Sequence, residues 1–165
     1  MIKKYLFFLL VSVIFNSFAY SASNSSGNND GKSMKINNFK KGSSLIKQAK
    51  KYEAQNKSEK AKKRFSKALK YLLISNKEKP NQPNTLNYLG FASRKIGNFK
   101  IAEKYYLEGL SIDPNHFGIN EYLGELYVNT GRLDKAKERL KVLENCNCEE
   151  FKELNNAIKS GSSKY

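Results

Sequence analysis

The chain has 165 residues, with 30 Lys or Arg and 15 Asp or Glu, so its formal net charge is +15. From this length we expect one domain with a continuous core and no second domain. One histidine and two cysteines leave too few ligands for a zinc site built from four such side chains.

Residues 1–19 have the composition of a secretory signal peptide. Lys3 and Lys4 precede an apolar run over residues 5–15, and small residues lead to a cleavage site near Ala19. The run is short for a transmembrane helix, although an uncleaved membrane anchor is the alternative. We therefore expect an exported protein, located in a Gram-negative periplasm.

Residues 20–41 are rich in Ser, Asn, Gly and Lys, and residues 160–165 form a similar polar tail. Such segments bury too little apolar surface to offset the conformational entropy that the chain loses when it becomes ordered. We expect a flexible linker over 20–41 and a loose tail over 160–165.

Two later segments can be aligned 34 residues apart. Residues 84–90 align with residues 118–124, and Gly97 aligns with Gly131. Apolar residues recur at helical spacing on both sides of these two glycines, which favour turns. A fixed period of this length is typical of helical hairpins that stack on one another.

The matched positions resemble the tetratricopeptide repeat. Counted from Pro83, the matching residues are Leu86, Leu89, Gly90, Ala102, Tyr106, Gly109 and Pro114. Counted from Phe117, they are Leu123, Gly124, Tyr127, Ala136, Leu140 and Leu143. Ser93 replaces a usual tyrosine, and Cys148 stands where proline is expected. The resemblance implies an all-α, right-handed α-solenoid.

A first repeat begins at Gly42 and brings Leu45, Ala49, Tyr52, Ala61, Phe65 and Ala68 to the family positions. Pro80 comes seven residues later than the pattern requires, so the second helix should run long, to about Asn76. A rival register starts at Ala49. It places polar residues where the family has Leu and Gly.

Residues 149–159 form one more amphipathic segment, with Phe151, Leu154 and Ile158 on one side. This pattern predicts a helix that caps the apolar end of the stack. The expected repeat domain therefore covers 42–159, with repeats at about 42–80, 83–116 and 117–148.

Charge is unevenly distributed. Residues 47–79 carry twelve Lys or Arg and three Glu, whereas residues 117–150 carry five Lys or Arg and seven Asp or Glu. The expected basic patch consists of Lys60, Lys63, Arg64, Lys67 and Lys70. It is either a solvated helix face or a docking surface for anionic membrane, wall polymer or acidic protein. No nucleic-acid-reading motif accompanies it, so we do not expect a nucleic acid partner.

Members of the resembled family bind peptides on the concave surface made by the first helix of each repeat. The resemblance places there Asn84, Asn87, Phe91, Arg94, Glu121, Glu125 and Val128. In this role an exposed Phe91 would anchor an apolar side chain, Arg94 would pair with a carboxylate, and asparagine amides would pair with peptide groups. The alternative is that these are ordinary exposed helix residues. The basic residues that clamp a terminal carboxylate in some members do not occur at matching positions.

Cys146 and Cys148 are the only cysteines. In an oxidising compartment we expect them to form a disulfide that staples the turn before the capping helix. Binding of a soft ion such as Cu(I), and thiol–disulfide exchange, are the alternatives. We expect His116 to be a turn or helix-start residue.

No phosphate-binding glycine loop, catalytic triad or paired carboxylate site occurs in the chain. We therefore expect a non-enzymatic scaffold or adaptor without a cofactor or metal, whose partner is a protein or peptide. The alternatives are an envelope protein held by the basic patch, and a metal or thiol-redox accessory protein. The oligomeric state is left open.

Overall fold

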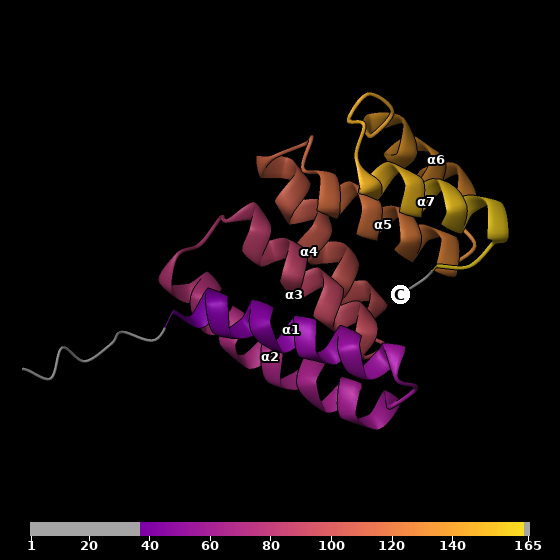
Figure 1. The fold of residues 1–165 in the computed structure, drawn as a ribbon. Coiled ribbons are helices and arrows are strands. Elements are labelled where there is room, and N and C mark those ends of the chain that lie inside the picture. The colour runs from indigo at the N-terminus through magenta and orange to yellow at the C-terminus, as the bar shows by residue number, and fades with distance from the viewer. Residues whose placement is uncertain (1–36, 164–165) are drawn as a thin grey trace, which may run out of the picture. The chain divides into compact units, whose positions relative to one another are not determined.

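The computed structural model describes residues 37–163. The predicted signal peptide, nearly all of the predicted linker and the last two residues of the tail lie outside this range. Within it the chain is all-α, with seven helices and no strand. In chain order the helices are α1 (Asn38–Ala54), α2 (Ser58–Glu78), α3 (Pro83–Lys95), α4 (Phe99–Ile112), α5 (Phe117–Asn129), α6 (Leu133–Val142) and α7 (Glu149–Ser160) (Figure 1).

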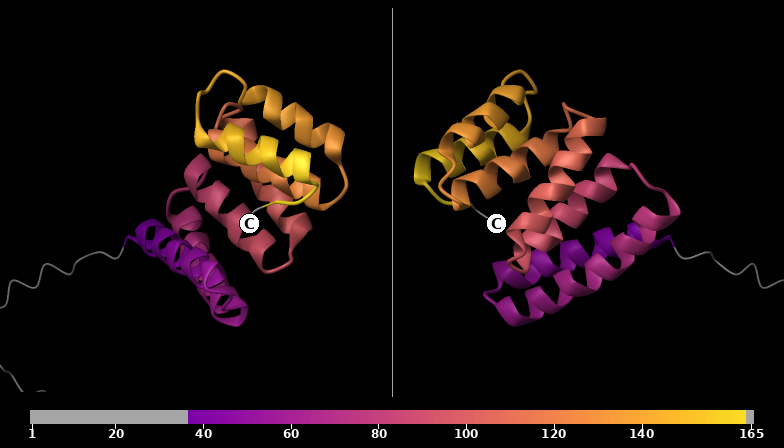
Figure 2. Two further views of the ribbon diagram at one scale, coloured as in Figure 1. Left: turned by 45° about the vertical axis from the view of Figure 1, so that its right-hand side comes forward. Right: turned by 180° about the vertical axis from the view of Figure 1, so that it is seen from behind.

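The first six helices form three antiparallel hairpins, α1/α2, α3/α4 and α5/α6, which follow one another along the molecule (Figures 1 and 2). Each hairpin turns at a residue with positive φ: Asn56 (58°), Gly97 (92°) and Gly131 (72°). Glycine and asparagine tolerate this conformation best, which explains their positions. When the first repeat is counted from Gly42, Asn56 occupies the position that Gly97 and Gly131 occupy in the later hairpins. Counting from Ala49 would instead place the turn inside α2, which is helical there.

The first hairpin is longer than the other two, because α1 begins earlier and α2 ends later than their counterparts. Helix α1 begins at Asn38, where the Asn37 side chain accepts a hydrogen bond from the backbone N–H of Lys40 and so caps the helix. Residues 38–41 are thus helical, although the sequence assigned them to a flexible linker. Helix α2 continues to Glu78, so its extra turns lie before Pro80.

Small residues allow the helices to approach closely. Ala102 and Ala136 are fully buried between helices. A Cβ at position 90 would lie only 2.6 Å from Cδ1 of Tyr106, a buried ring that fills the space beside α3. These contacts are the packing that the repeated Gly and Ala positions predict.

Helix α7 packs against α5 and α6. Its Leu154 is fully buried, and a Cβ at position 124 would lie 2.5 Å from Leu154 Cδ2. Gly161 ends the helix with φ 69°, the left-handed conformation usual for a helix C-cap. No helix within residues 37–163 combines the length and the apolar character that crossing a membrane requires.

Candidate partner-binding face

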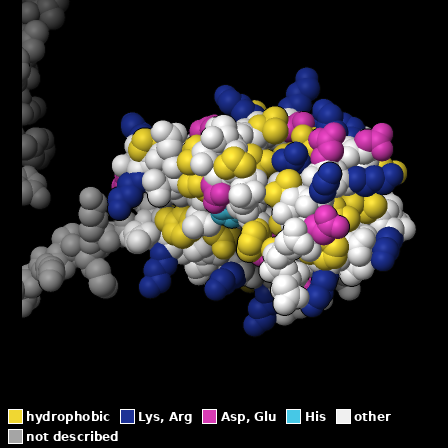
Figure 3. All heavy atoms as spheres, turned by 90° about the horizontal axis from the view of Figure 1, so that it is seen from above, with side chains coloured by type: hydrophobic (Ala, Val, Ile, Leu, Met, Phe, Trp, Pro, Cys, Tyr) yellow, Lys and Arg dark blue, Asp and Glu magenta, His cyan; other side chains and the backbone are white. Residues whose placement is uncertain are grey.

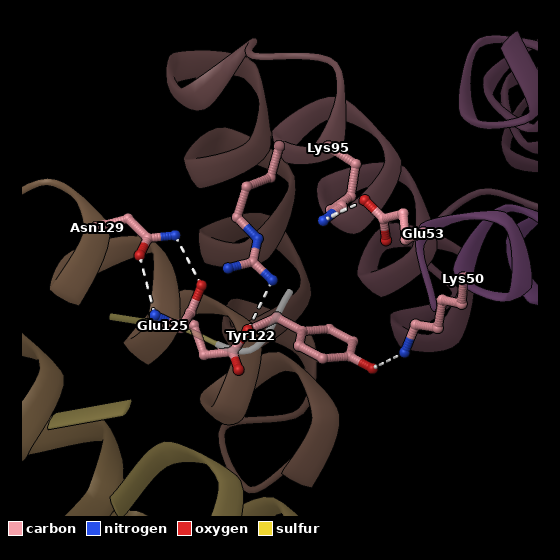
Figure 4. A network of polar contacts seen from close by, with 8 residues as sticks. Lys50, Glu53, Lys95, Tyr122, Glu125 and Asn129 are labelled. Carbon is pink, nitrogen blue, oxygen red and sulfur yellow. Dashed lines mark hydrogen bonds and ion pairs between the residues drawn. The ribbon is translucent and has the colours of Figure 1, made fainter. Parts of the chain in front are cut away.

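Helices α1, α3 and α5 are the first helices of the three hairpins, and they bring one set of polar and aromatic side chains together (Figure 4). We call this set the α1–α3–α5 face. Figure 4 labels Lys50, Glu53, Lys95, Tyr122, Glu125 and Asn129 of this set. Its other members are Asn87, Phe91, Arg94 and Glu121, which contact or interact with these residues or with α5. The face contains five of the seven residues that the resemblance assigned to partner binding. Asn84 and Val128 lie on the same helices.

Most of the expected binding residues are buried. Asn84 is exposed, whereas Asn87, Phe91, Arg94, Glu121, Glu125 and Val128 are all buried. The expectation of an exposed Phe91 is wrong. Its side chain is 0% exposed and packs between Phe65 of α2 and Tyr122 of α5, with ring centroids 5.8 and 4.7 Å away. Phe91 is therefore a core residue that supports the face from below.

Arg94 and Glu125 form a buried ion pair. Arg94 Nη2 donates to Glu125 Oε2 at 2.7 Å, and the two side chains are 2% and 0% exposed. Arg94 therefore pairs with a carboxylate of its own chain and not, as expected, with a carboxylate of a partner. Glu125 Oε1 and Asn87 Oδ1 have no hydrogen-bond partner within residues 37–163, whereas the Arg94 guanidinium also interacts with the buried Tyr106 hydroxyl.

Lys50 of α1 joins the face, although no pattern in the sequence selected it. Its ammonium group donates to the Tyr122 hydroxyl at 2.9 Å and lies 4.5 Å from the centre of the Phe91 ring. Burial lowers the pKa of Lys50, although nearby carboxylates partly offset this effect. Next to it, Lys95 pairs with Glu53 at 2.6 Å, so α1 and α3 are also joined by an ion pair (Figure 4).

Glu121 has the most perturbed carboxyl group of the face. Burial raises its pKa to about 8, and the negative charges of Glu125, Glu150 and Glu153 add to this effect while Lys50 opposes it. At neutral pH the Glu121 carboxyl group therefore mostly carries a proton and can donate a hydrogen bond. The face thus offers both donors and acceptors in a poorly hydrated setting.

Residues 161–163 return to this face. Asn129, at the end of α5, donates to the Ser163 hydroxyl at 2.9 Å and accepts a hydrogen bond from the Ser163 backbone N–H at 3.3 Å (Figure 4). The left-handed Gly161 makes this reversal possible.

The expected basic patch lies on α2. Lys60, Lys63, Lys67 and Lys70 are exposed, and Arg64 is half-buried with its guanidinium 6.0 Å from the centre of the Tyr52 ring. Seen from above, Lys and Arg side chains lie around the edge of the molecule with Asp and Glu side chains among them (Figure 3).

Cys146 and Cys148 are joined by a disulfide in the turn between α6 and α7. No group of three or more metal-ligating side chains occurs within residues 37–163. His116 caps α5, because its Nδ1 accepts from the Ile119 backbone N–H at 3.2 Å, and its Nε2 lies 3.0 Å from Asn84 Oδ1.

Comparisons with known proteins identify the repeat. Residues 83–116 match one sequence model described as tetratricopeptide repeat, and residues 105–138 match a second. No curated protein matches the chain.

Solved structures show the same fold. The Yersinia enterocolitica type III secretion translocator chaperone SycD is 20% identical with a TM-score of 0.51, and the match covers 72% of this chain and 78% of SycD. A mutant O-GlcNAc transferase of Thermobaculum terrenum is 15% identical with a TM-score of 0.53. That match covers 78% of this chain but only 23% of the transferase.

Proposed function

From the tetratricopeptide repeat fold of the described residues, we propose that the chain is a non-enzymatic adaptor that binds a protein or peptide partner on its α1–α3–α5 face. One observation carries the proposal. Buried polar atoms nearly always have hydrogen-bond partners, yet Glu125 Oε1 and Asn87 Oδ1 have none within residues 37–163.

A peptide segment has the chemistry to satisfy these atoms. Its N–H groups can donate to Glu125 Oε1 and Asn87 Oδ1. The guanidinium also lies 5.8 Å from the centre of the Tyr122 ring, so an ordered partner would meet an aromatic surface next to a fixed cation. The arrangement suits binding, with Phe91 acting as support and not as an anchor.

We also propose that the chain acts outside the cytoplasm, in the periplasm. The leader-like residues 1–19 support this location, and so does the Cys146–Cys148 disulfide, because disulfides persist in oxidising compartments. Fractionation of cells tests it: the chain should be released by osmotic shock in a form shortened near Ala19.

Site-specific photo-crosslinking tests the binding face. A photo-reactive residue at Asn129, an exposed member of the α1–α3–α5 face, should give a discrete adduct with one partner in cells. The matched control is the same residue at Leu107, which is 49% exposed on α4. Equal adducts from both positions would contradict the proposal.

The purified partner then allows a quantitative test. Asn87→Ala should weaken binding about tenfold, because a buried hydrogen bond made only in the complex is lost. Exposed Lys104→Ala on α4 should leave the dissociation constant unchanged. An unchanged affinity for Asn87→Ala, with helical content preserved, would place the site elsewhere.

A further inference from the structure

A hollow of about 440 Å³ lies between α1 and α2, apart from the α1–α3–α5 face. We call it the α1–α2 hollow, and its lining residues are Asn37, Lys40, Lys41, Ser44, Leu45, Gln48, Arg64 and Lys67. None of them belongs to the α1–α3–α5 face. Four of the eight are cations, and no acidic side chain within residues 37–163 lines the hollow.

The four cations come from both helices of the hairpin. Lys40 and Lys41 lie in the first turn of α1, and Arg64 and Lys67 lie in the middle of α2. None of them forms an ion pair with an acidic side chain of residues 37–163. Like charges that converge on one cavity repel one another, and a bound anion removes this repulsion.

Aromatic rings hold two of these cations in place. Lys41 Nζ lies 4.5 Å from the centre of the Tyr71 ring, and the Arg64 guanidinium lies 6.0 Å from that of Tyr52. Cation–π contacts of this kind restrict long side chains without neutralising them. Both residues therefore keep their positive charge while they line the hollow.

The uncharged lining groups add hydrogen-bonding capacity. Ser44 supplies a hydroxyl and Gln48 an amide, while Leu45 contributes an apolar side chain. A guanidinium with several ammonium groups is the donor set that phosphate recognition uses, since arginine binds phosphate oxygens in pairs and lysine acts as a point charge. The volume exceeds that of a phosphate group and leaves room for the moiety that carries it.

We propose that the α1–α2 hollow binds the phosphate group of a phosphomonoester or phosphodiester ligand. Of the five residues of the predicted basic patch, only Arg64 and Lys67 line this hollow. The proposed phosphate site therefore includes only part of that patch. Lys60 lies outside it, and Lys63 and Lys70 line a neighbouring depression on α2 that shares Lys67 with the hollow. The inference does not depend on the proposed peptide-binding function.

Titration of the full chain with inorganic phosphate, followed by NMR at constant ionic strength, tests the proposal. Backbone amides of residues 40–48 and 64–67 should shift together and saturate with one dissociation constant. The double variant Arg64→Gln/Lys67→Gln should raise that constant at least about tenfold, because it removes two charge-assisted contacts.

The matched control is Lys60→Gln/Lys77→Gln, which removes the same charge from exposed positions of α2 outside the hollow. It should raise the dissociation constant less than about twofold, because the general attraction of a net charge of +15 changes little. Equal weakening by the two double variants would overturn the proposal, as would shifts that spread over all lysines without saturation.

The variant Lys40→Gln/Lys41→Gln provides the same test from α1 if the α2 variant fails to fold. A second experiment identifies the source of the phosphate. Binding to phosphatidylglycerol vesicles that inorganic phosphate reverses at constant ionic strength would identify a lipid headgroup. Phosphate binding without vesicle binding would identify a non-membrane phosphorylated ligand.

Discussion

At the level of single residues, the Arg94–Glu125 pair is the more deeply buried of the two ion pairs on the α1–α3–α5 face. Two charges have been removed from water, and each is acceptable in the folded chain only because the other lies 2.7 Å away. The pair also joins the second hairpin to the third, so its integrity matters beyond its own helices.

We expect Glu125→Ala to lower the free energy of unfolding by about 3–5 kcal/mol, since it leaves the Arg94 charge buried without its partner. The double variant Arg94→Met/Glu125→Leu should recover much of this loss, because it buries no charge. Urea unfolding followed by circular dichroism measures both. A double variant as unstable as the single one would show that packing, and not the unpaired charge, causes the loss.

Glu121 should make stability depend on pH. Its pKa of about 8 in the folded chain lies above the usual value of 4.5, so the folded state retains a proton that the unfolded state loses. The free energy of unfolding should therefore fall as pH rises from about 5 to about 8, by up to about 1.4 kcal/mol per pH unit. Below that range the contribution of Glu121 is constant.

Glu121→Gln should abolish most of this decline. The stability of the variant relative to the parent chain should therefore increase as pH rises. Unfolding in urea at pH 5, 6.5 and 8 measures the difference, with exposed Glu144→Gln on the α6–α7 turn as the control. Parallel pH profiles for the parent chain and Glu121→Gln would mean that the carboxyl group titrates normally.

The sequence predicted which helices meet at this face but not how their side chains pair. Arg94 and Glu125 are 31 residues apart. This separation is about one helical turn shorter than the 34-residue period of the repeat. Opposite charges at this spacing on successive first helices are a signal that could have revealed the pair. The burial of Phe91 could not be predicted, because it depends on where the α5 ring of Tyr122 lies.

At the level of elements, the short turns are the best-predicted features. The positive φ of Gly97 and Gly131 follows from the glycines themselves, and the late Pro80 correctly indicated a long α2. The start of α1 was missed, because residues 38–41 are polar except for Phe39 and become helical through the Asn37 cap and packing against α2. Composition alone does not report such tertiary support.

The disulfide should contribute little to stability. Cys146 and Cys148 are separated by one residue, so the bond closes a very small loop and removes little entropy from the unfolded chain. We expect Cys146→Ser/Cys148→Ser to lower the free energy of unfolding by at most about 2 kcal/mol and to leave the helical content unchanged.

Urea unfolding of this variant, and of the parent chain with and without dithiothreitol, measures the contribution. Titration of the purified parent chain should find no free thiol before reduction. Two reactive thiols in protein prepared without reductant would favour the metal or thiol-exchange alternatives, which otherwise stay predictions.

At the level of the whole described domain, stability should vary along the stack. Each hairpin contacts chiefly its neighbours, and the apolar core divides into one cluster over α1–α3 and another over α4–α7. In such arrays a local defect weakens adjacent repeats more than distant ones.

Leu154→Ala should therefore destabilise the C-terminal part first. The fully buried Leu154 fills the space beside Gly124, and its truncation leaves a cavity that costs about 2–5 kcal/mol. Hydrogen exchange followed by mass spectrometry should show faster exchange in α5, α6 and α7 than in the parent chain, with α1 and α2 little changed. Uniform acceleration across all seven helices would indicate one cooperative unit.

The two hydrogen bonds between Asn129 and Ser163 have a practical consequence for anyone who labels this protein. They fix the exit of the polypeptide beside helix α5, so an affinity tag or fluorescent protein fused after residue 163 would emerge next to the surface proposed to receive the partner. Pull-down with such a fusion risks masking the interaction that it is meant to capture, whereas a label at exposed Lys104 on α4 would lie outside that surface.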